Sequence, residues 1–141
     1  MRQEKHNYDK DFYKWAYAQA DLLKSKEFEK IDLQNLIEEV ESLGKSEKHA
    51  LESQIIRLLL HMLKIEYQPK KRTKSWDRSI LNARIEIDRK VKQNPSLKKE
   101  LKNLIQESFP YAIKSAALET GLDLKTFPKE CPWSLKEILG E

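Results

Sequence analysis

The chain has 141 residues, of which 35% are charged, and its 27 basic and 23 acidic side chains leave a formal net charge of +4. This length suits one domain of ordinary size, which can bury a core without disulfides or a structural metal. The charge excess is too small for the strongly basic surface that is typical of nucleic-acid-binding domains. The single cysteine, Cys131, excludes an intrachain disulfide and favours a reducing compartment.

The sequence pattern predicts neither export nor membrane insertion. The longest apolar run, Leu58 to Leu60, is far too short to cross a bilayer. Residues 1–11 are polar and lack the apolar stretch of a signal peptide. We therefore expect a cytoplasmic protein with no membrane partner, and we expect residues 1–7 to form a flexible N-terminus.

Apolar residues recur with helical spacing through the first half of the chain. Asp32 is a favourable N-cap, and Gly44 is predicted to end or bend the helix that Asp32 begins. Ser46 is predicted to cap the next helix, which Pro69 stops. The apolar stripe of the helix before Gly44 consists of Leu33, Leu36, Ile37, Val40 and Leu43. The helices predicted in this half are 9–24, 32–43 and 46–67.

The second half shows the same helical spacing, with recognisable start and stop residues. Ser75, Ser96 and Ser134 are predicted N-caps, and Gly121 is a natural C-cap. Pro110 removes one helical hydrogen bond, so a kink or a restart is expected there. The helices predicted in this half are 75–93, 96–120 and 135–139.

The arrangement of these segments predicts the fold class. No segment shows the sustained two-residue alternation of a β-strand. The connections are short, so successive helices should pack antiparallel. We expect an all-α fold, a compact bundle of about five longer helices plus a short C-terminal helix, as a single helical domain over 1–141.

Several short strings, spread over nearly the whole chain, resemble those of one known family. The strings are YDKDFYKWA at 8–16, NLIEEVESLG at 35–44, HMLK at 61–64, YQP at 67–69, SW at 75–76, ETGL at 119–122, FP at 127–128 and CPW at 131–133. Together they are similar to the bacterial family called domain of unknown function 29. The resemblance implies a helical fold in one small domain, and it implies no activity, substrate or catalytic residue.

Some polar residues lie in or beside the predicted apolar stripes. Arg84 is the clearest case, because it falls between Ile80 and Ile87 and must reach water or a partner. One interpretation is a polar chamber in which Glu and His bind a metal and Arg84 binds an oxyanion or phosphate. The other is an internal salt-bridge network from Arg84 to Glu119 or Glu41. The candidate cluster is Gln19, Glu39, Glu41, His61, Arg84 and Glu119.

Catalytic signatures are otherwise missing from the sequence. The Glu-x-x-His signature of di-metal helical bundles does not occur, so we predict no cofactor and keep a divalent metal only as an alternative. Cys131 follows the acidic Glu130 rather than a cation, so nothing nearby in the sequence lowers the pKa of its thiol.

A basic region, residues 64–78, follows the third predicted helix. Cations interleaved with the aromatic residues Tyr67 and Trp76 can contact phosphates and stack on bases. The alternative is an ordinary solvated turn. The cations are Lys64, Lys70, Lys71, Arg72, Lys74 and Arg78.

Three classes of function therefore stay open. The first is a small non-catalytic cytoplasmic module that acts through contacts with an unknown protein partner or with itself. The second is a nucleic-acid-associated protein that uses the 64–78 region. The third is a metal-dependent hydrolase that uses the chamber. The missing catalytic signature favours the first class over an enzyme.

Overall fold

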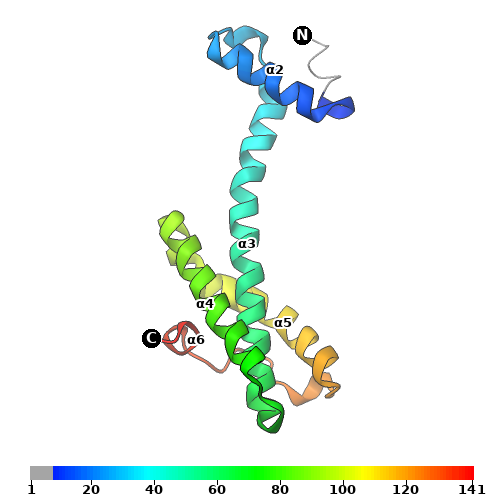
Figure 1. Ribbon diagram of the computed structural model, residues 1–141, viewed down its shortest axis with the longest axis vertical. Helices are drawn as coiled ribbons and strands as arrows, with labels where there is room; N and C mark the ends of the chain where they lie inside the picture. The colour runs from blue at the N-terminus through cyan, green and yellow to red at the C-terminus, as the bar shows by residue number, and fades with distance from the viewer. Residues whose placement is uncertain (1–7) are drawn as a thin grey trace. The chain divides into compact units, whose positions relative to one another are not determined.

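The computed structural model describes residues 8–141, and within this range no residue lies in a strand, which confirms the all-α class (Figure 1). The expected flexible segment 1–7 lies outside the described residues. The α-helices are α2 (Phe12–Lys24), α3 (Leu33–Tyr67), α4 (Lys74–Gln93), α5 (Leu101–Thr120) and α6 (Leu135–Leu139). The 3-10 helices are η1 (Phe28–Lys30), η2 (Pro69–Lys71), η3 (Pro95–Glu100) and η4 (Leu124–Thr126).

The chain divides into two compact units, Met1–Ser46 and Glu47–Glu141. We name them the N-terminal unit and the C-terminal unit and describe each by itself. The unbroken helix α3 contributes residues to both. The single domain expected over 1–141 therefore stays a prediction.

Helix α3 passes through Gly44, where the sequence predicted an end or a bend between two helices. The predicted division into 32–43 and 46–67 is wrong, and Ser46 lies inside the helix instead of capping one. Gly44 does not have the positive φ that ends a helix. A glycine inside a helix costs only about 1 kcal/mol relative to alanine, so good helix formers on both sides carry the helix through it.

The N-terminal unit is held by a small buried polar centre between α2 and α3. Trp15 donates from its indole nitrogen to the carboxylate of Asp32 over 3.1 Å. The backbone N–H of Asp32 donates to the side-chain oxygen of Gln19 over 2.7 Å. All three residues are buried. Tyr8 and Phe12 pack their rings against Trp15, with ring centres 4.7 Å and 5.5 Å from that of Trp15.

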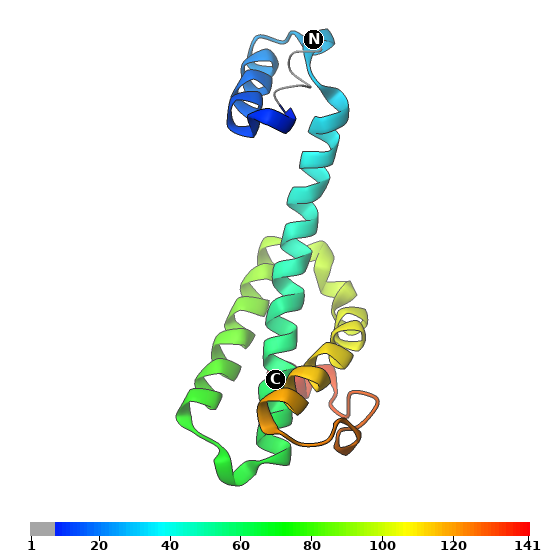
Figure 2. The same cartoon turned by 90° about the vertical axis from the view of Figure 1, so that its right-hand side faces the viewer.

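The C-terminal unit is built on the second part of α3, with α4 and α5 beside it (Figures 1 and 2). Lys90 pairs with Glu47 at 2.6 Å, so α4 runs antiparallel to α3 from the turn at η2. Lys64 pairs with Glu119 at 2.8 Å, which joins α3 to α5. The core between them includes Leu51, Ile55, Leu58, Leu59, Leu63, Ala83, Ile87, Leu104, Phe109, Ala112 and Ile138.

The helix ends agree with the sequence at some residues and differ at others. Gly121 ends α5 in the left-handed conformation, and Ser134 begins α6 with a full capping box, both as predicted. Thr73 caps α4, two residues before the predicted Ser75, because its hydroxyl accepts from the N–H of Trp76. The predicted cap Ser96 lies within η3, which precedes α5. Helix α5 continues through Pro110 without a restart.

Candidate functional site

The predicted polar cluster is distributed over both units. Gln19, Glu39 and Glu41 belong to the N-terminal unit, whereas His61, Arg84 and Glu119 belong to the C-terminal unit. Among residues 8–141, no three His, Cys, Asp or Glu side chains gather in a group that could hold a metal ion.

In the N-terminal unit, two of the predicted polar residues join α2 and the helical residues 8–10 to α3 and its N-cap. Gln19 accepts from the backbone of Asp32, as described above. Glu39 accepts a hydrogen bond from the hydroxyl of Tyr8 at 2.6 Å, and this bond raises the pKa of Tyr8 from 10.0 to about 12. Glu41 is exposed. Gln19 and Glu39 thus have structural partners within their own unit.

Arg84 of the C-terminal unit is bonded to the end of α6. Its Nε donates to the carbonyl oxygen of Ile138 at 2.9 Å, and its Nη2 donates to that of Glu137 at 3.2 Å. The last carbonyls of a helix have no partner within it and carry partial negative charge, so a guanidinium stabilises them. The carboxylate partner that the sequence suggested, Glu119 or Glu41, is replaced here by backbone carbonyls.

The two remaining members of the cluster bond elsewhere. Nδ1 of His61 lies 2.8 Å from the carbonyl oxygen of Arg57, one turn earlier in α3. Glu119 pairs with Lys64. Within the C-terminal unit, His61, Arg84 and Glu119 thus bond to different partners.

Two of the six cations of the basic region pair with carboxylates. Lys64 has a side chain only 12% exposed, which pairs with Glu119 and lies 4.6 Å from the ring centre of Trp76. Arg72 pairs with Asp77 at 2.8 Å. The other four cations, Lys70, Lys71, Lys74 and Arg78, are exposed.

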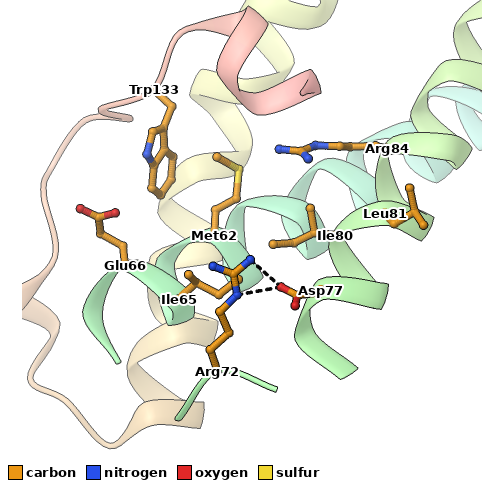
Figure 3. A pocket seen from close by; sticks show the side chains of 9 residues that line it. All are labelled: Met62, Ile65, Glu66, Arg72, Asp77, Ile80, Leu81, Arg84 and Trp133. Atoms are coloured by element: carbon orange, nitrogen blue, oxygen red, sulfur yellow. Dashed lines mark hydrogen bonds and ion pairs between the residues drawn. The ribbon is translucent and has the colours of Figure 1, made fainter. Parts of the chain in front are cut away.

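A pocket of about 390 Å³ lies beside this region in the C-terminal unit (Figure 3). Its apolar walls come from Met62, Ile65, Ile80, Leu81 and Trp133. Figure 3 shows the Arg72–Asp77 ion pair at its edge and Arg84 on the side of α4, across from Trp133. Because both guanidinium groups already have partners, the pocket offers a mainly apolar surface with a neutralised charge pair.

Cys131 lies at a second pocket, with Trp133 and Ser134. Burial raises the pKa of its thiol, so less thiolate is present at neutral pH than in a free cysteine. This agrees with the sequence, which offered no group to activate Cys131 as a nucleophile.

The N-terminal unit exposes many large apolar side chains, a feature that the sequence analysis missed. The apolar stripe before Gly44 is largely uncovered, because four of its residues are exposed: Leu33, Ile37, Val40 and Leu43. On α2 and η1 the exposed aromatic residues are Phe12, Tyr13, Tyr17 and Phe28. Helical periodicity revealed the stripe but could not show that no other helix covers it.

A comparison with known protein families shows which family the chain belongs to. The family model described as domain of unknown function DUF29 matches residues 7–141. The chain belongs to this family. No curated protein and no solved structure matches this DUF29 chain. Across residues 8–141, each DUF29 helix is too short or too polar to cross a bilayer.

Proposed function

We propose that this protein is a non-catalytic, cytoplasmic helical module that acts through protein–protein contacts, and that its N-terminal unit supplies the interface. The observation that carries the proposal is the exposed aromatic surface of α2. Tyr13 is 73% exposed and Tyr17 is 59% exposed, with their ring centres 4.8 Å apart. Phe12 is half exposed on the same helix.

Such a surface favours a binding role over a purely structural one. Monomeric proteins rarely expose contiguous patches of large apolar side chains, and exposed patches commonly mark interaction sites. Tyrosine is among the residues that most often dominate binding energy at interfaces, because it buries a large rigid area with little loss of freedom. The N-terminal unit has only a small buried centre, formed by Trp15, Gln19 and Asp32. A partner that covers the exposed aromatic residues of α2 would enlarge the buried part of this unit.

The two alternative functions have less support from the contacts. Five of the six residues of the candidate cluster bond to separate partners within their own units. In the basic region, Lys64 and Arg72 are already paired with carboxylates. The half-buried thiol of Cys131 supports the cytoplasmic part of the proposal, since an unpaired cysteine suits a reducing compartment.

The test is site-specific photo-crosslinking of the full chain in the cells that produce it. A photoreactive amino acid replaces Tyr17 in one variant and exposed Asn103 of α5 in a matched control. We expect the photoreactive group at position 17 to crosslink the same protein in each repeat of the experiment, and the group at position 103 to give no such product. Tyr13→Ala, added to the chain with the group at position 17, should reduce the yield of the crosslinked product. Equal, diffuse labelling at both positions would overturn the proposal.

A further inference from the structure

One face of α3 in the N-terminal unit is apolar, uncharged and uncovered. Leu33 is 60% exposed, Ile37 is 49% exposed and Val40 is 64% exposed. At about 100° per residue, these residues and Gly44 lie within roughly 60° of arc on one side of the helix. The face formed by Leu33, Ile37, Val40 and Gly44 is named the α3 stripe.

Gly44 has no purpose in the packing of the chain itself. A Cβ atom built on it meets nothing within 4 Å, and its φ is not in the left-handed region. Glycine weakens the interior of a helix, so a glycine that the backbone does not require suggests a close approach from outside. Its missing side chain leaves a notch at one end of the α3 stripe, while Leu33 projects at the other end.

We propose, building on the proposed function, that a second copy of this chain packs its own α3 stripe antiparallel against this one. The two-fold axis passes midway between Ile37 and Val40. Leu33 of each copy then lies opposite the Gly44 notch of the other, and Ile37 lies opposite Val40. A two-fold interface must be self-complementary in this way, because the same patch is used twice.

The charged side chains of this segment lie outside the contact face. Glu38, Glu41 and Lys45 all lie off the stripe, as expected for the core of an interface, where charged residues are depleted. In the proposed register, Glu41 of one copy is level with Leu36 of the other. Glu38 of one copy is level with Glu39 of the other, but both lie about 130° around the helix from the middle of the stripe, so they do not face each other.

The size of the stripe sets the strength of the association. From Leu33 to Gly44 the helix rises only about 17 Å at 1.5 Å per residue. One helix face of this length buries less than the roughly 800 Å² per partner of a standard stable interface. We therefore expect a reversible dimer whose population rises with concentration, with a Kd on the order of micromolar or weaker.

The first test is sedimentation velocity of the full chain over a range of concentrations, with charge variants of α3. We expect the mass to rise from 16.7 kDa towards twice that value. Val40→Lys should weaken the association by about tenfold or more. Ser42→Lys is the matched control, since Ser42 is exposed on the opposite side of α3, and it should associate like the parent. Circular dichroism confirms that both variants keep their helix content.

The second test fixes the register by disulfide formation in chains that also carry Cys131→Ser. We expect Leu33→Cys mixed with Gly44→Cys to form a mixed disulfide dimer, because a disulfide needs Cα atoms within about 7 Å. Neither variant alone should form one, since its two copies of the cysteine lie about 17 Å apart along the helix axis. Leu33→Cys mixed with Ser42→Cys is the negative control.

Each outcome bears on one claim. A chain that stays monomeric at every concentration, or a Leu33→Cys chain that crosslinks with itself, overturns the antiparallel dimer. If Tyr17 still yields discrete adducts with another protein, the proposed function stands without the dimer. If the dimer forms but Tyr17 yields only diffuse labelling, the dimer stands and the wider proposal of a protein-binding surface on α2 fails.

Discussion

Arg84 and Ile138 are joined by a hydrogen bond of 2.9 Å from the guanidinium Nε to the backbone carbonyl oxygen. This bond explains how an arginine occupies the apolar face of α4. Its charge is partnered by the carbonyl end of a short helix, and Ile138, itself buried, is thereby held in the core. One side chain of α4 thus fixes the position of the C-terminal helix.

We predict that Arg84→Ala lowers the free energy of unfolding of the C-terminal unit by about 2 kcal/mol, because charge-assisted hydrogen bonds are lost and carbonyls stay partly buried. Arg84→Lys should lose less, since it keeps a donor without the two-pronged geometry. Urea unfolding followed by circular dichroism measures both. An alanine variant as stable as the parent would show that the contact contributes nothing.

Gly140→Ala is predicted to lower the free energy of unfolding more than Gly121→Ala does. The two glycines have the same left-handed backbone: Gly140 ends α6 with a φ of 77°, and Gly121 ends α5 with a φ of 76°. Both substitutions strain the backbone by about 1 kcal/mol. At Gly140 the new Cβ would also lie 2.9 Å from Nη1 of Arg84, whereas at Gly121 it meets nothing within 4 Å. The guanidinium would have to move away from the carbonyls that hold it.

The check on this explanation is a double-mutant cycle in the urea unfolding assay. In an Arg84→Ala background the extra loss at Gly140 should disappear, so that Gly140→Ala and Gly121→Ala cost the same. If the difference between the two glycines persists without Arg84, the close contact is not its cause.

These contacts show which structural features could be predicted from the sequence. Local signals were sufficient at Gly121 and Ser134, because a helix cap depends on only a few neighbouring residues. The helix end predicted at Gly44 was wrong, because the small cost of a glycine in a helix is outweighed by the strong helix formers on both sides. The partner of Arg84 lies more than fifty residues away, and helical periodicity marks an arginine as needing a partner without telling which group supplies it.

The same reasoning explains the candidate site. Periodicity identified the apolar stripe at 33–43, and four of its residues are exposed in the structure. A helix face is apolar whether its own chain or another molecule covers it, so only the packed structure separates the two cases.

The pKa of the Tyr8 phenol is predicted to be raised to about 12, mainly because its hydroxyl donates to the carboxylate of Glu39. Since the folded-state pKa lies above 10.0, this bond favours the folded N-terminal unit below pH 10, and the contribution is lost as the pH rises through about 12. Carbon-13 NMR of labelled tyrosines follows the titration directly.

Two variants separate the hydrogen bond from the general charge of α3. Glu39→Gln should bring the pKa of Tyr8 back towards 10.0, whereas Glu41→Gln, which removes an acid that does not touch Tyr8, should leave it near 12. Equal effects of the two variants would argue against a specific bond.

The basic region is predicted to bind nucleic acid only at low salt. Lys64 and Arg72 are engaged with carboxylates, so the four other cations of the region are left to replace the counterions of the phosphate backbone, and this small number makes binding weak and sensitive to salt. Fluorescence anisotropy of labelled single- and double-stranded oligonucleotides, with Lys70→Ala/Lys71→Ala beside the parent, measures this. Tight binding that survives about 0.15 M salt and is lost in the variant would favour the nucleic-acid function instead.

Gly44→Ala is predicted to change folding and association in opposite directions. In dilute solution, where the chain is monomeric, alanine should raise the stability of α3 by about 1 kcal/mol, because the new methyl group meets nothing in its own chain. At high concentration the same methyl group fills the notch that Leu33 of a second copy would occupy, so the dimer should weaken. Thermal unfolding at low concentration and sedimentation at high concentration give the two signs, and a variant that gains in both would show that no close helix contact uses Gly44.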